Sequence, residues 1–588
     1  MAEYSEKKLS VKPALDYSIK IGGEAGQGIQ TIGDTLAKVF SRSGYHVFTH
    51  QDYESRIRGG HSFFQIRFSD RPVMASRDGI DIIVALDKES ILLHEKELTE
   101  NGLVIYDSSA LGSKHESHSF LDIPFNKIAL EHGNKIMANT VATGAILGML
   151  KMNPDVLSDI IKDTFSKKGE SVVEANMKAA LSGHEFALKN CPKCSFVPAP
   201  AGKPKMMISG TEGIALGAIA SGCKLYSAYP MTPSTGIMNY LAGKEKEYGI
   251  IVEQAEDEIA AINMALGASF AGVRAMTGTA GGGFALMAEG LSLAGMTEIP
   301  VVIALGQRPA PATGLPTRTE QGDLFFALYA GHGEFPRIVF APGTPEQAFS
   351  VTNKAFDMAE HYQIPAIIIF DQYLGDTEWT FDEFDLKKIK YHDYRLRGDE
   401  FRKTEGYRRY AFTDTGISPL GIPGDSKSVV VADSDEHNEE GHIIEDAEIR
   451  IKMVQKRLFM KLPLIRKEIE PPHFYGSGQP EIVIAGWGST YGVLKEVVDT
   501  LSKDRDIALM HFTELCPFPG TEKFDYLKVL REAKLTVCIE NNATGQFSRL
   551  MKMETGYDFQ QRIHKYDGRP FTLEGLLKEM EKVLLKKF

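Results

Sequence analysis

Three stretches of this sequence share one pattern, in which an apolar strand runs into a glycine-containing turn and then into residues at helical spacing. They begin near Tyr17, Met206 and Glu481. Apolar strands that alternate with helices are typical of α/β units, in which largely parallel strands lie beneath covering helices. The pattern therefore predicts an α/β protein with three α/β domains. No short-period repeat is evident, so the three stretches indicate a common architecture rather than duplication.

The length of 588 residues is several times that of one domain, which fits this division. A proline-rich stretch without periodicity, between Asn190 and Pro204, marks the first boundary. From Thr377 to about Pro472 the sequence becomes charged and irregular, which indicates either an ordered connector or a mobile linker. The predicted parts are a first domain over 1–195, a central domain over 205–376, a connector over 377–475 and a last domain over 476–588.

The charge pattern limits the classes of partner. A net charge of -12, with acidic and basic residues interspersed, argues against a surface that binds nucleic acid. The polar segment Met1 to Asp16 lacks the apolar core of a signal peptide, and no later stretch approaches the roughly 18 apolar residues that span a bilayer. We therefore expect a cytoplasmic enzyme without a membrane contact.

No metal site is predicted in this chain. Cys191 and Cys194 form the only close cysteine pair among five cysteines, and the second pair that a zinc or four-iron site needs is missing. We interpret the pair as a turn in a linker rather than as a metal or redox site, and expect no disulfide framework. His437 and His442 lie in an acidic run, which favours a solvated loop over a metal site.

A first glycine loop contains Gly23, Gly26 and Gly28, between a strand and a helix predicted over 29–42. Bare backbone N–H groups at such a junction bind phosphate, but a tight turn uses the same residues, and the order differs from the dinucleotide motif. Further along, Arg56 and Arg58 stand beside two glycines, a combination that suits a polyphosphate. A solvated turn with surface arginines is the alternative.

The segment from Tyr229 to Thr235, YPMTPST, follows a predicted strand. Pro230 and Pro233 restrict the backbone on both sides of Thr232, so a rigid loop presents its hydroxyl group. The alternative is a simple turn at the end of a strand.

An acidic triplet, Glu256-Asp257-Glu258, precedes an alanine-rich helix that includes Gly267. A carboxyl group at this strand-to-helix junction either caps the helix or acts on a cofactor. Thiamine enzymes as a class carry a glutamate ahead of such a helix, at a set spacing from a glycine. Glu258 matches that arrangement better than Glu256 does.

These motifs resemble those of one family. The YPMTPST loop, the EDEIAA helix start, and the segments that contain Arg308 and Arg318 (GQRP and GLPTRTEQ) resemble the α subunit of the 2-oxoacid:ferredoxin oxidoreductases. The region before Pro204 resembles their γ subunit, fused at the N-terminus. The resemblance covers nearly the whole chain and implies a pyrimidine-type thiamine diphosphate-binding central domain and a transketolase-C-like last domain.

The resemblance also implies roles for individual residues. Glu258 would hydrogen-bond the aminopyrimidine ring of thiamine diphosphate and tune the cofactor, with Tyr229 and Pro230 beside it. Thr232 would contact the substrate, and Arg308 or Arg318 would bind its carboxylate. The choice between the two arginines stays open. The phosphates of coenzyme A would be held by Gly23, Gly26, Gly28, Arg56 and Arg58.

One departure from the family pattern concerns the other half of the site. The family's β subunit carries a GDG motif for Mg²⁺ and the diphosphate, and cysteines for a four-iron cluster; this chain has neither. The resemblance therefore implies a β subunit that supplies both, ferredoxin as electron acceptor, and an (αβ)₂ assembly.

The predicted function is coenzyme A-dependent oxidative decarboxylation of a 2-oxoacid. The appearance of the fused chain favours 2-oxoglutarate, with succinyl-CoA as product, while pyruvate, branched-chain and aryl oxoacids stay open, as does the direction of the reaction. Two alternatives remain: one half of a non-oxidative thiamine-dependent decarboxylase, and a non-catalytic coenzyme A-binding or assembly protein.

Overall fold

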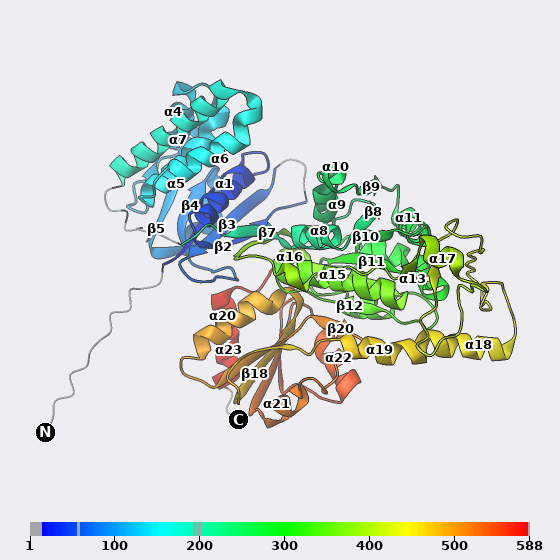
Figure 1. The fold of residues 1–588 in the computed structure, drawn as a ribbon. Helices are drawn as coiled ribbons and strands as arrows, with labels where there is room; N and C mark the ends of the chain where they lie inside the picture. Colours follow the sequence, from blue (N-terminus) through cyan, green and yellow to red (C-terminus); the bar gives the residue numbers. More distant parts are fainter. Residues whose placement is uncertain (1–14, 56–58, 192–193, 195, 197–201, 586–588) are drawn as a thin grey trace. The chain divides into compact units, whose positions relative to one another are not determined.

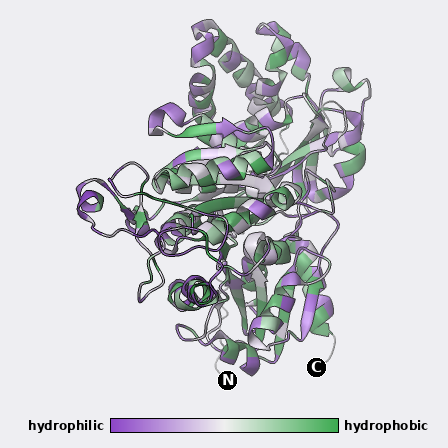
Figure 2. Cartoon of the chain, turned by 90° about the vertical axis from the view of Figure 1, so that its right-hand side faces the viewer, coloured by the Kyte–Doolittle hydropathy of each residue, from purple (hydrophilic) through white to green (hydrophobic). Residues whose placement is uncertain are grey.

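The computed structural model describes residues 15–55, 59–191, 194, 196 and 202–585 (Figure 1). The chain divides into two compact units. One comprises residues up to 207 together with 380–382, and the other comprises 208–379 and 383–588. Many buried strands are green in Figure 2, whereas purple gathers on outer helices and loops. This distribution is the one expected of α/β layers, whose strands are buried by helices.

The first unit contains a mixed sheet with strand order β6-β5-β4-β1-β3-β2. β1 pairs in parallel with β4 and antiparallel with β3. The strands are β1 (Asp16–Glu24), β2 (His46–Asp52), β3 (His61–Ser69), β4 (Ile80–Ala85), β5 (Leu98–Tyr106) and β6 (Phe120–Asp122). Two further strands, β7 (Met206–Ser209) and β14 (Glu378–Phe381), each include residues assigned to both units. The helices are α1 (Ile29–Arg42), α2 (Lys88–His94), α3 (Ser108–Leu111), α4 (Phe125–Glu131), α5 (Ala138–Met149), α6 (Asp155–Phe165) and α7 (Glu170–Asn190).

Several sequence predictions for this unit can be compared directly with the structure. The predicted helix 29–42 is confirmed, because its apolar positions Ile32, Leu36 and Phe40 form one buried face. β3 was not predicted from the sequence. It pairs with β1 in antiparallel register, with Glu24 opposite His61.

The second unit contains two larger sheets and one small one. The central sheet has the order β20-β12-β13-β11-β10-β8-β9, and all its pairs are parallel except that of β20 with β12. Its strands are β8 (Cys223–Ala228), β9 (Ile251–Gln254), β10 (Arg274–Ala280), β11 (Val301–Gln307), β12 (Ile338–Phe340), β13 (Pro365–Asp371) and β20 (Glu514–Cys516). The surrounding helices are α8 (Gly210–Ala220), α9 (Thr235–Ala242), α10 (Glu245–Tyr248), α11 (Glu258–Phe270), α12 (Gly281–Leu286), α13 (Ala288–Thr297), α14 (Leu324–Tyr329), α15 (Pro345–Tyr362) and α16 (Gln372–Asp376).

The C-terminal sheet has the order β17-β19-β18-β21-β22. Its elements are β17 (His473–Gly476), β18 (Ile482–Trp487), α20 (Tyr491–Leu501), β19 (Ile507–Phe512), α21 (Tyr526–Glu532), β21 (Leu535–Glu540), α22 (Gln546–Thr555), β22 (Gln561–His564) and α23 (Leu573–Leu585). One hydrophobic cluster includes Ile303 of the central sheet and both Val483 and Met510 of the C-terminal sheet. The two sheets therefore share a core, and the domain boundaries predicted between them stay predictions.

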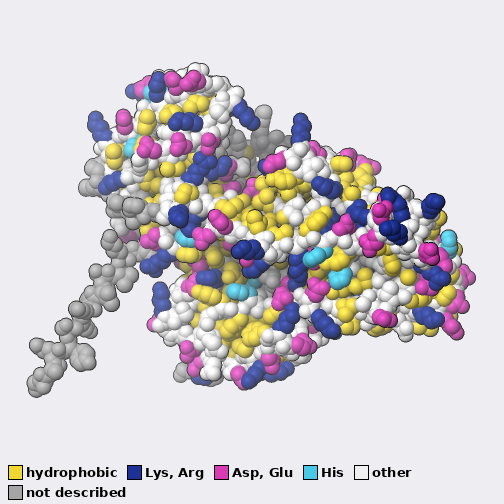
Figure 3. Space-filling model, viewed as in Figure 1, with side chains coloured by type: hydrophobic (Ala, Val, Ile, Leu, Met, Phe, Trp, Pro, Cys, Tyr) yellow, Lys and Arg dark blue, Asp and Glu magenta, His cyan; other side chains and the backbone are white. Residues whose placement is uncertain are grey.

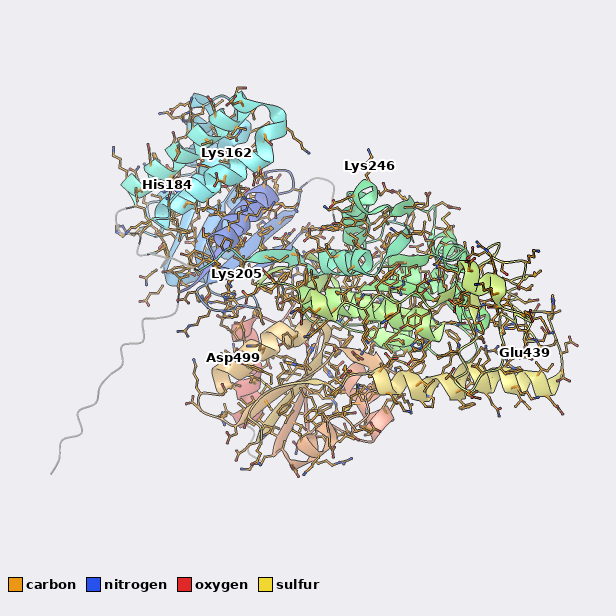
Figure 4. All side chains as sticks on the ribbon, in the orientation of Figure 1. Lys162, His184, Lys205, Lys246, Glu439 and Asp499 are labelled. Carbon is orange, nitrogen blue, oxygen red and sulfur yellow. A yellow bond between two sulfur atoms is a disulfide. The ribbon has the colours of Figure 1, made fainter. Side chains whose placement is uncertain are left out.

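The connector over 377–475 is ordered, which selects one of its two interpretations. Its elements include β15 (Arg395–Leu396), α17 (Gly398–Lys403), β16 (Leu420–Gly421), α18 (Ala447–Val454), a π-helical stretch (Gln455–Met460) and α19 (Lys461–Glu468). Glu439, labelled in Figure 4, pairs with Arg408 and accepts the N–H of Phe412 at 3.0 Å. His437 is buried against Tyr410, with ring centroids 3.9 Å apart, so the predicted solvated loop is wrong for this residue.

Cys191 and Cys194 form a disulfide, which the sequence analysis did not predict. The N–H of Cys194 also donates to the Cys191 carbonyl group at 3.1 Å, so the expected turn is present as well.

A buried ionic cluster holds the connector on the central sheet. Glu298, at the C-terminal end of α13, binds the ammonium groups of Lys456 and Lys461, and all three are at most 1% exposed. Arg409 donates to the Glu298 carbonyl group at 2.7 Å. Burial alone would raise the pKa of Glu298, but the three facing cations hold that pKa below its ordinary value. Glu298 is therefore charged at neutral pH and compensates the buried lysines.

We predict that Glu298→Ala lowers the free energy of unfolding by about 3–5 kcal/mol, because it leaves two buried lysines without their counter-ion. Urea denaturation followed by circular dichroism measures the change. Glu289→Ala, which removes an exposed carboxylate from the same helix, is the matched control and should change stability by less than about 0.5 kcal/mol. Equal effects of the two variants would contradict the anchoring role.

Candidate functional site

The predicted site residues of the second unit follow directly on parallel strands of the central sheet. Tyr229 to Thr232 follow β8, Glu258 comes shortly after β9, and Arg308 follows β11. Parallel strands present their carboxyl ends at one edge, and ligands of open α/β sheets bind at that edge. The carboxyl ends of β8 and β9 are aligned, since Ala228 lies opposite Gln254 in this parallel pair. The sheet therefore gathers residues that lie far apart in sequence.

Thr232 lies in a loop that Arg308 holds in place. A guanidinium N–H of Arg308 donates to the Thr232 carbonyl oxygen at 2.9 Å, and the hydroxyl group of Ser234 donates to the Met231 carbonyl oxygen at 2.8 Å. Thr232 is half-buried, whereas the side chain of Tyr229 is 41% exposed. Pro230 lies between them and is also half-buried. The prolines predicted a rigid loop, and the hydrogen bond from the Arg308 guanidinium group restrains the same loop.

Glu258 is the first residue of α11, but the helix does not use it as a cap. The carboxylate of the preceding Asp257 accepts the N–H of Ala260 at 2.8 Å, which satisfies the helix N-terminus. The side chain of Glu258 is 3% exposed, and its Oε1 atom is buried without a hydrogen-bond partner among the described residues. An unpaired buried carboxylate oxygen costs about 1–3 kcal/mol, so its retention indicates a role toward a bound group.

The surroundings of Glu258 form a close-fitting cradle. A Cβ atom added at Gly283 would lie 2.3 Å from Oε1 of Glu258 and 2.2 Å from the hydroxyl oxygen of Thr279. That hydroxyl group lies 4.0 Å from the sulfur of Met231, in the loop that contains Thr232. Only glycine fits at position 283, so the first turn of α12 brings its backbone against the carboxylate.

Asp323 is a second buried carboxylate at this edge, and the sequence analysis missed it. A Cβ atom added at Gly281 would lie 2.7 Å from Oδ2 of Asp323, and that oxygen has no hydrogen-bond partner in the described part of the chain. Burial raises the pKa of Asp323 to about 6, although the charge of Arg308 acts in the opposite direction. The sequence around Asp323, just after PTRTEQ, did not indicate a buried carboxylate. The glycine that encloses it, Gly281, lies 42 positions earlier in the sequence.

Arg318 lies in a segment that contacts the C-terminal sheet. The N–H of Thr319 donates to the Gly568 carbonyl oxygen at 3.3 Å, and a Cβ atom added at Gly568 would lie 3.3 Å from Cβ of Arg318. The side chain of Arg318 is half-buried. The two candidate arginines therefore have different supports. Arg308 donates a hydrogen bond to the Thr232 loop, and the stem of Arg318 packs against Gly568, in the loop after β22.

In the first unit, the glycine loop borders a cavity of about 520 Å³. Gly26 and Gly28 have φ angles of 93° and 87°, in the region that glycine favours, and Gly28 precedes α1 without a side-chain cap. Gly23 lies near the end of β1, and neither Gly23 nor Gly28 lines the cavity. The cavity is lined by Gly26, Gln27, Ala85, Leu86, Asp107, Ala110, Leu111, Phe125, Asn126, Lys135, Ile136, Ala138 and Asn139. Arg56 and Arg58 lie outside the described residues.

The described part of the chain contains no group of three or more His, Cys, Asp or Glu side chains with the arrangement of a metal site. Helices long and apolar enough to cross a membrane are likewise absent from it.

The donor set at Glu258 fits the pyrimidine half of thiamine diphosphate. Such a ring offers nitrogen atoms that exchange a proton with a carboxyl group, and the Oε1 atom of Glu258 is the unpaired buried oxygen such a contact uses. The Gly283 cradle leaves the backbone close to this oxygen.

Comparisons with known proteins find matches over nearly the whole chain. A family model described as pyruvate flavodoxin/ferredoxin oxidoreductase, thiamine diphosphate-binding, matches residues 216–456, and a pyruvate ferredoxin/flavodoxin oxidoreductase model matches residues 18–186. The α subunit of a 2-oxoacid:ferredoxin oxidoreductase from a Sulfolobus species is 32% identical, with 96% of each chain covered. A 2-oxoglutarate oxidoreductase subunit of Mycobacterium tuberculosis is 27% identical, over 94% of this chain and 89% of that protein.

A solved structure is similar over nearly the full length. It is the 2-oxoglutarate:ferredoxin oxidoreductase from Magnetococcus marinus with 2-oxoglutarate, coenzyme A and succinyl-CoA bound. Its sequence is 30% identical, the TM-score is 0.88, and the match covers 96% of this chain and 99% of that chain.

We predict that Gly283→Ala disturbs the cradle and that Gly282→Ala does not. The Cβ atom at 283 would overlap Glu258 and Thr279, whereas the closest atom to one at 282 lies 4.0 Å away. Gly283→Ala should therefore lower the free energy of unfolding by about 1–3 kcal/mol. Gly282→Ala should leave it unchanged or raise it by up to about 1 kcal/mol, from helix propensity.

Urea denaturation of both variants measures these changes. Equal stability of the two variants would contradict the close contact between Gly283 and Glu258.

Proposed function

This chain belongs to the 2-oxoacid:ferredoxin oxidoreductases as an α subunit, and we propose that its reaction is the coenzyme A-dependent oxidative decarboxylation of 2-oxoglutarate. The observation that carries the proposal is the buried, unpaired Oε1 atom of Glu258 at the carboxyl edge of the central sheet. The protein holds and tunes the cofactor, and the cofactor supplies the difficult chemistry.

Glu258 is proposed as the residue that tunes thiamine diphosphate. When bound, the cofactor supplies a carbon nucleophile for the keto group of the substrate. Glu258 holds a proton at Oε1 toward the pyrimidine ring, and the buried surroundings exclude water from this contact. Tyr229 and Pro230 border the loop beside this position and complete the proposed cofactor contacts.

Thr232 and an arginine are proposed to bind the substrate. The Thr232 loop is fixed by the hydrogen bond from Arg308, so its hydroxyl group has a defined position. An arginine fork matches a carboxylate bidentately, and 2-oxoglutarate carries two carboxylates. The names of the relatives from Mycobacterium tuberculosis and Magnetococcus marinus support 2-oxoglutarate as the substrate.

The cavity beside the first glycine loop is proposed to bind coenzyme A. Gly26 lines the cavity, and Gly28 precedes α1 without a side-chain cap. The N-terminus of a helix favours phosphate oxygens. Lys135 lines the same cavity and supplies a positive charge. Gly23, which lies in β1, stays within this proposal, as do Arg56 and Arg58 outside the described residues. The relative solved with coenzyme A supports the assignment of this ligand.

The remaining half of the site is proposed to come from a β subunit that carries Mg²⁺, the diphosphate motif and a four-iron cluster, within an (αβ)₂ assembly that passes electrons to ferredoxin. α11 begins at Glu258 and presents Ile259 and Met264 at 50% and 39% exposure, and Leu286 of α12 is 50% exposed. Figure 3 shows hydrophobic side chains on the surface of the second unit. Apolar side chains beside a cofactor residue are typical of a subunit contact.

Two other functions are separated by product analysis. A non-oxidative thiamine decarboxylase would release an aldehyde without coenzyme A, and a non-catalytic assembly protein would give no decarboxylation with any partner. The experiment is anaerobic affinity purification of the chain from its host, with assays for iron, thiamine diphosphate and 2-oxoacid turnover in the eluate. Recovery of the chain without either cofactor would contradict the proposed function.

We predict that Glu258→Gln lowers kcat by at least about 1,000-fold, because an amide does not exchange the proton that the carboxyl group holds. The measurement is ferredoxin reduction by the purified complex, together with thiamine content. Glu256→Gln is the matched control, since Glu256 is exposed and two residues away. Retained activity in Glu258→Gln with loss in Glu256→Gln would move the role to Glu256.

We predict that Lys135→Met raises the KM for coenzyme A several-fold and leaves the KM for the 2-oxoacid unchanged, because it removes one charge-assisted phosphate contact. Lys127→Met, an exposed lysine on the neighbouring α4 that does not line the cavity, is the control. A changed 2-oxoacid KM with a normal coenzyme A KM would place coenzyme A elsewhere.

A further inference from the structure

Asp323 is a buried carboxylate at the edge of the central sheet to which the proposed function assigns no task. It stands at the N-terminus of α14, but its side chain makes no hydrogen bond that caps this helix. The side chain is 9% exposed, and its Oδ2 atom is buried without a hydrogen-bond partner among the described residues. The helix therefore does not explain the carboxyl group, since a capping aspartate binds the first backbone N–H groups with its oxygens.

Asp323 and Glu258 lie against one turn of the backbone. The first turn of α12, which directly follows β10, contains Gly281 and Gly283. A Cβ atom added at Gly281 would lie 2.7 Å from Oδ2 of Asp323, and one added at Gly283 would lie 2.3 Å from Oε1 of Glu258. Two buried carboxyl groups, each with an unpaired oxygen, therefore contact the same turn. Asp323 thus belongs to the site of the proposed cofactor residue.

Two further charged groups face Asp323. Burial raises the pKa of Asp323 to about 6, although the charge of Arg308, which also binds the Thr232 carbonyl oxygen, acts in the opposite direction. Glu320 is half-buried, and burial and the charge of Asp323 both raise its pKa. Asp323 therefore exchanges its proton closer to neutral pH than an exposed aspartate does. A carboxyl group with this property suits general acid–base catalysis.

The backbone around Asp323 is held from two sides. On one side, Gln307, the last residue of β11, accepts the N–H of Asp323 at 3.0 Å. On the other side, Gln546 of α22 donates to the Gly322 carbonyl oxygen at 2.6 Å and accepts the N–H of Phe325 at 3.0 Å. The residues before and after Asp323 are therefore fixed as well.

The C-terminal sheet supplies a third support through Gln321. β18 lies between β19 and β21, and the crevice at the carboxyl ends of such parallel strands is the usual ligand site of doubly wound sheets. Gln321 occupies this crevice, because its Nε2 atom donates to the Trp487 carbonyl oxygen at 2.8 Å and its Oε1 atom accepts the N–H of Asn541 at 2.9 Å. A carboxyl group on so restrained a backbone, with one oxygen left unpaired, is preorganised for a bound group.

We propose that Asp323 is a second acid–base residue of this site, beside Glu258. It passes a proton from Oδ2 to the keto oxygen of the 2-oxoacid when that oxygen takes up the electron pair of the C=O π bond, and it is left as a carboxylate. When the same carbon is oxidised to the acyl group, the oxygen returns this proton to Asp323, and two electrons leave toward ferredoxin. The proton is therefore conserved over one turnover. This inference rests on the proposed function, because it assigns a residue to the same reaction.

The first test is Asp323→Asn in the purified complex with its β subunit. The amide keeps the shape of the side chain but has no proton to pass, so kcat should fall by about 100-fold or more, while the KM for coenzyme A stays unchanged. The kcat/KM profile of the wild type for the 2-oxoacid should contain a limb that falls as the pH rises through about 6, and the variant should lack it. Asp504→Asn, at an exposed aspartate of the same unit, is the matched control and should keep both kcat and this limb.

A second measurement does not depend on turnover. Because the pKa of Asp323 is raised in the folded chain, its burial lowers stability progressively as the pH rises from its ordinary pKa to about 6, and the full loss is present above that pH. Asp323→Asn should therefore raise the midpoint urea concentration of the full chain, and by more at about pH 7.5 than at about pH 5. A carboxylate that only stabilises the fold would give a lower midpoint instead, and Asp504→Asn should change neither value.

Gly281→Ala tests the same contact from the other side. Its Cβ atom would lie 2.7 Å from Oδ2 and displace the carboxyl group. It should therefore lower kcat in the wild-type background and change it by less than about twofold in the Asp323→Asn background, because both substitutions act through one group. Additive effects of the two substitutions would contradict the role of Asp323.

The wild-type complex, assayed with a panel of 2-oxoacids, separates this inference from the proposed function. A kcat of Asp323→Asn within about twofold of the wild-type value, or a lower urea midpoint at both pH values, would overturn the inference and leave the proposed function standing. Absence of wild-type turnover with every 2-oxoacid would contradict the proposed function, and the inference would fall with it.

Discussion

Parallel pairing in the central sheet is the constraint on which the site depends. β8, β10, β11 and β13 all run in one direction, so the loops after them meet at one edge. Thr232, Glu258, Gly283 and Arg308 become neighbours of that edge although they span 77 positions, from 232 to 308. An antiparallel arrangement would send alternate loops to opposite edges. The chemistry therefore follows from the strand direction before any individual contact is considered.

Sequence reasoning reached those residues whose signal is local. Thr232 stands between prolines, and Glu258 opens an alanine-rich helix, so a short stretch of sequence contained the evidence for each. Asp323 and Gln321 have no such local signal, because the residues that contact their side chains are distant in sequence. The burial of His437 was missed for the same reason: its acidic neighbours predicted solvent, whereas Tyr410 covers its ring. Local pattern predicts elements and their junctions, and long-range packing decides which polar groups are enclosed.

The unpaired oxygen of Glu258 has an energetic consequence. Its isolation costs about 1–3 kcal/mol in a chain whose total stability is of the order of 10 kcal/mol. Contacts elsewhere in the same unit offset this cost, including the shared core of the two sheets and the anchor at Glu298. In the proposed function, a cofactor that pairs this oxygen also stabilises the complex on binding. The proposal therefore couples stability and function at one carboxyl group.

The C-terminal sheet shows how an α/β architecture contributes to a site without touching a ligand. Its crevice holds Gln321, so the groups that would bind a small molecule bind a segment of protein instead. Gln546 of α22 bonds the backbone of the same segment at Gly322 and Phe325. Thr319, on the other side of the segment, accepts the N–H of Tyr373, which follows β13. Both sheets of the unit therefore fix this segment when the chain folds, and its loss of conformational freedom is met at that stage. A substitution in the C-terminal sheet is then able to move residues that follow the strands of the central sheet.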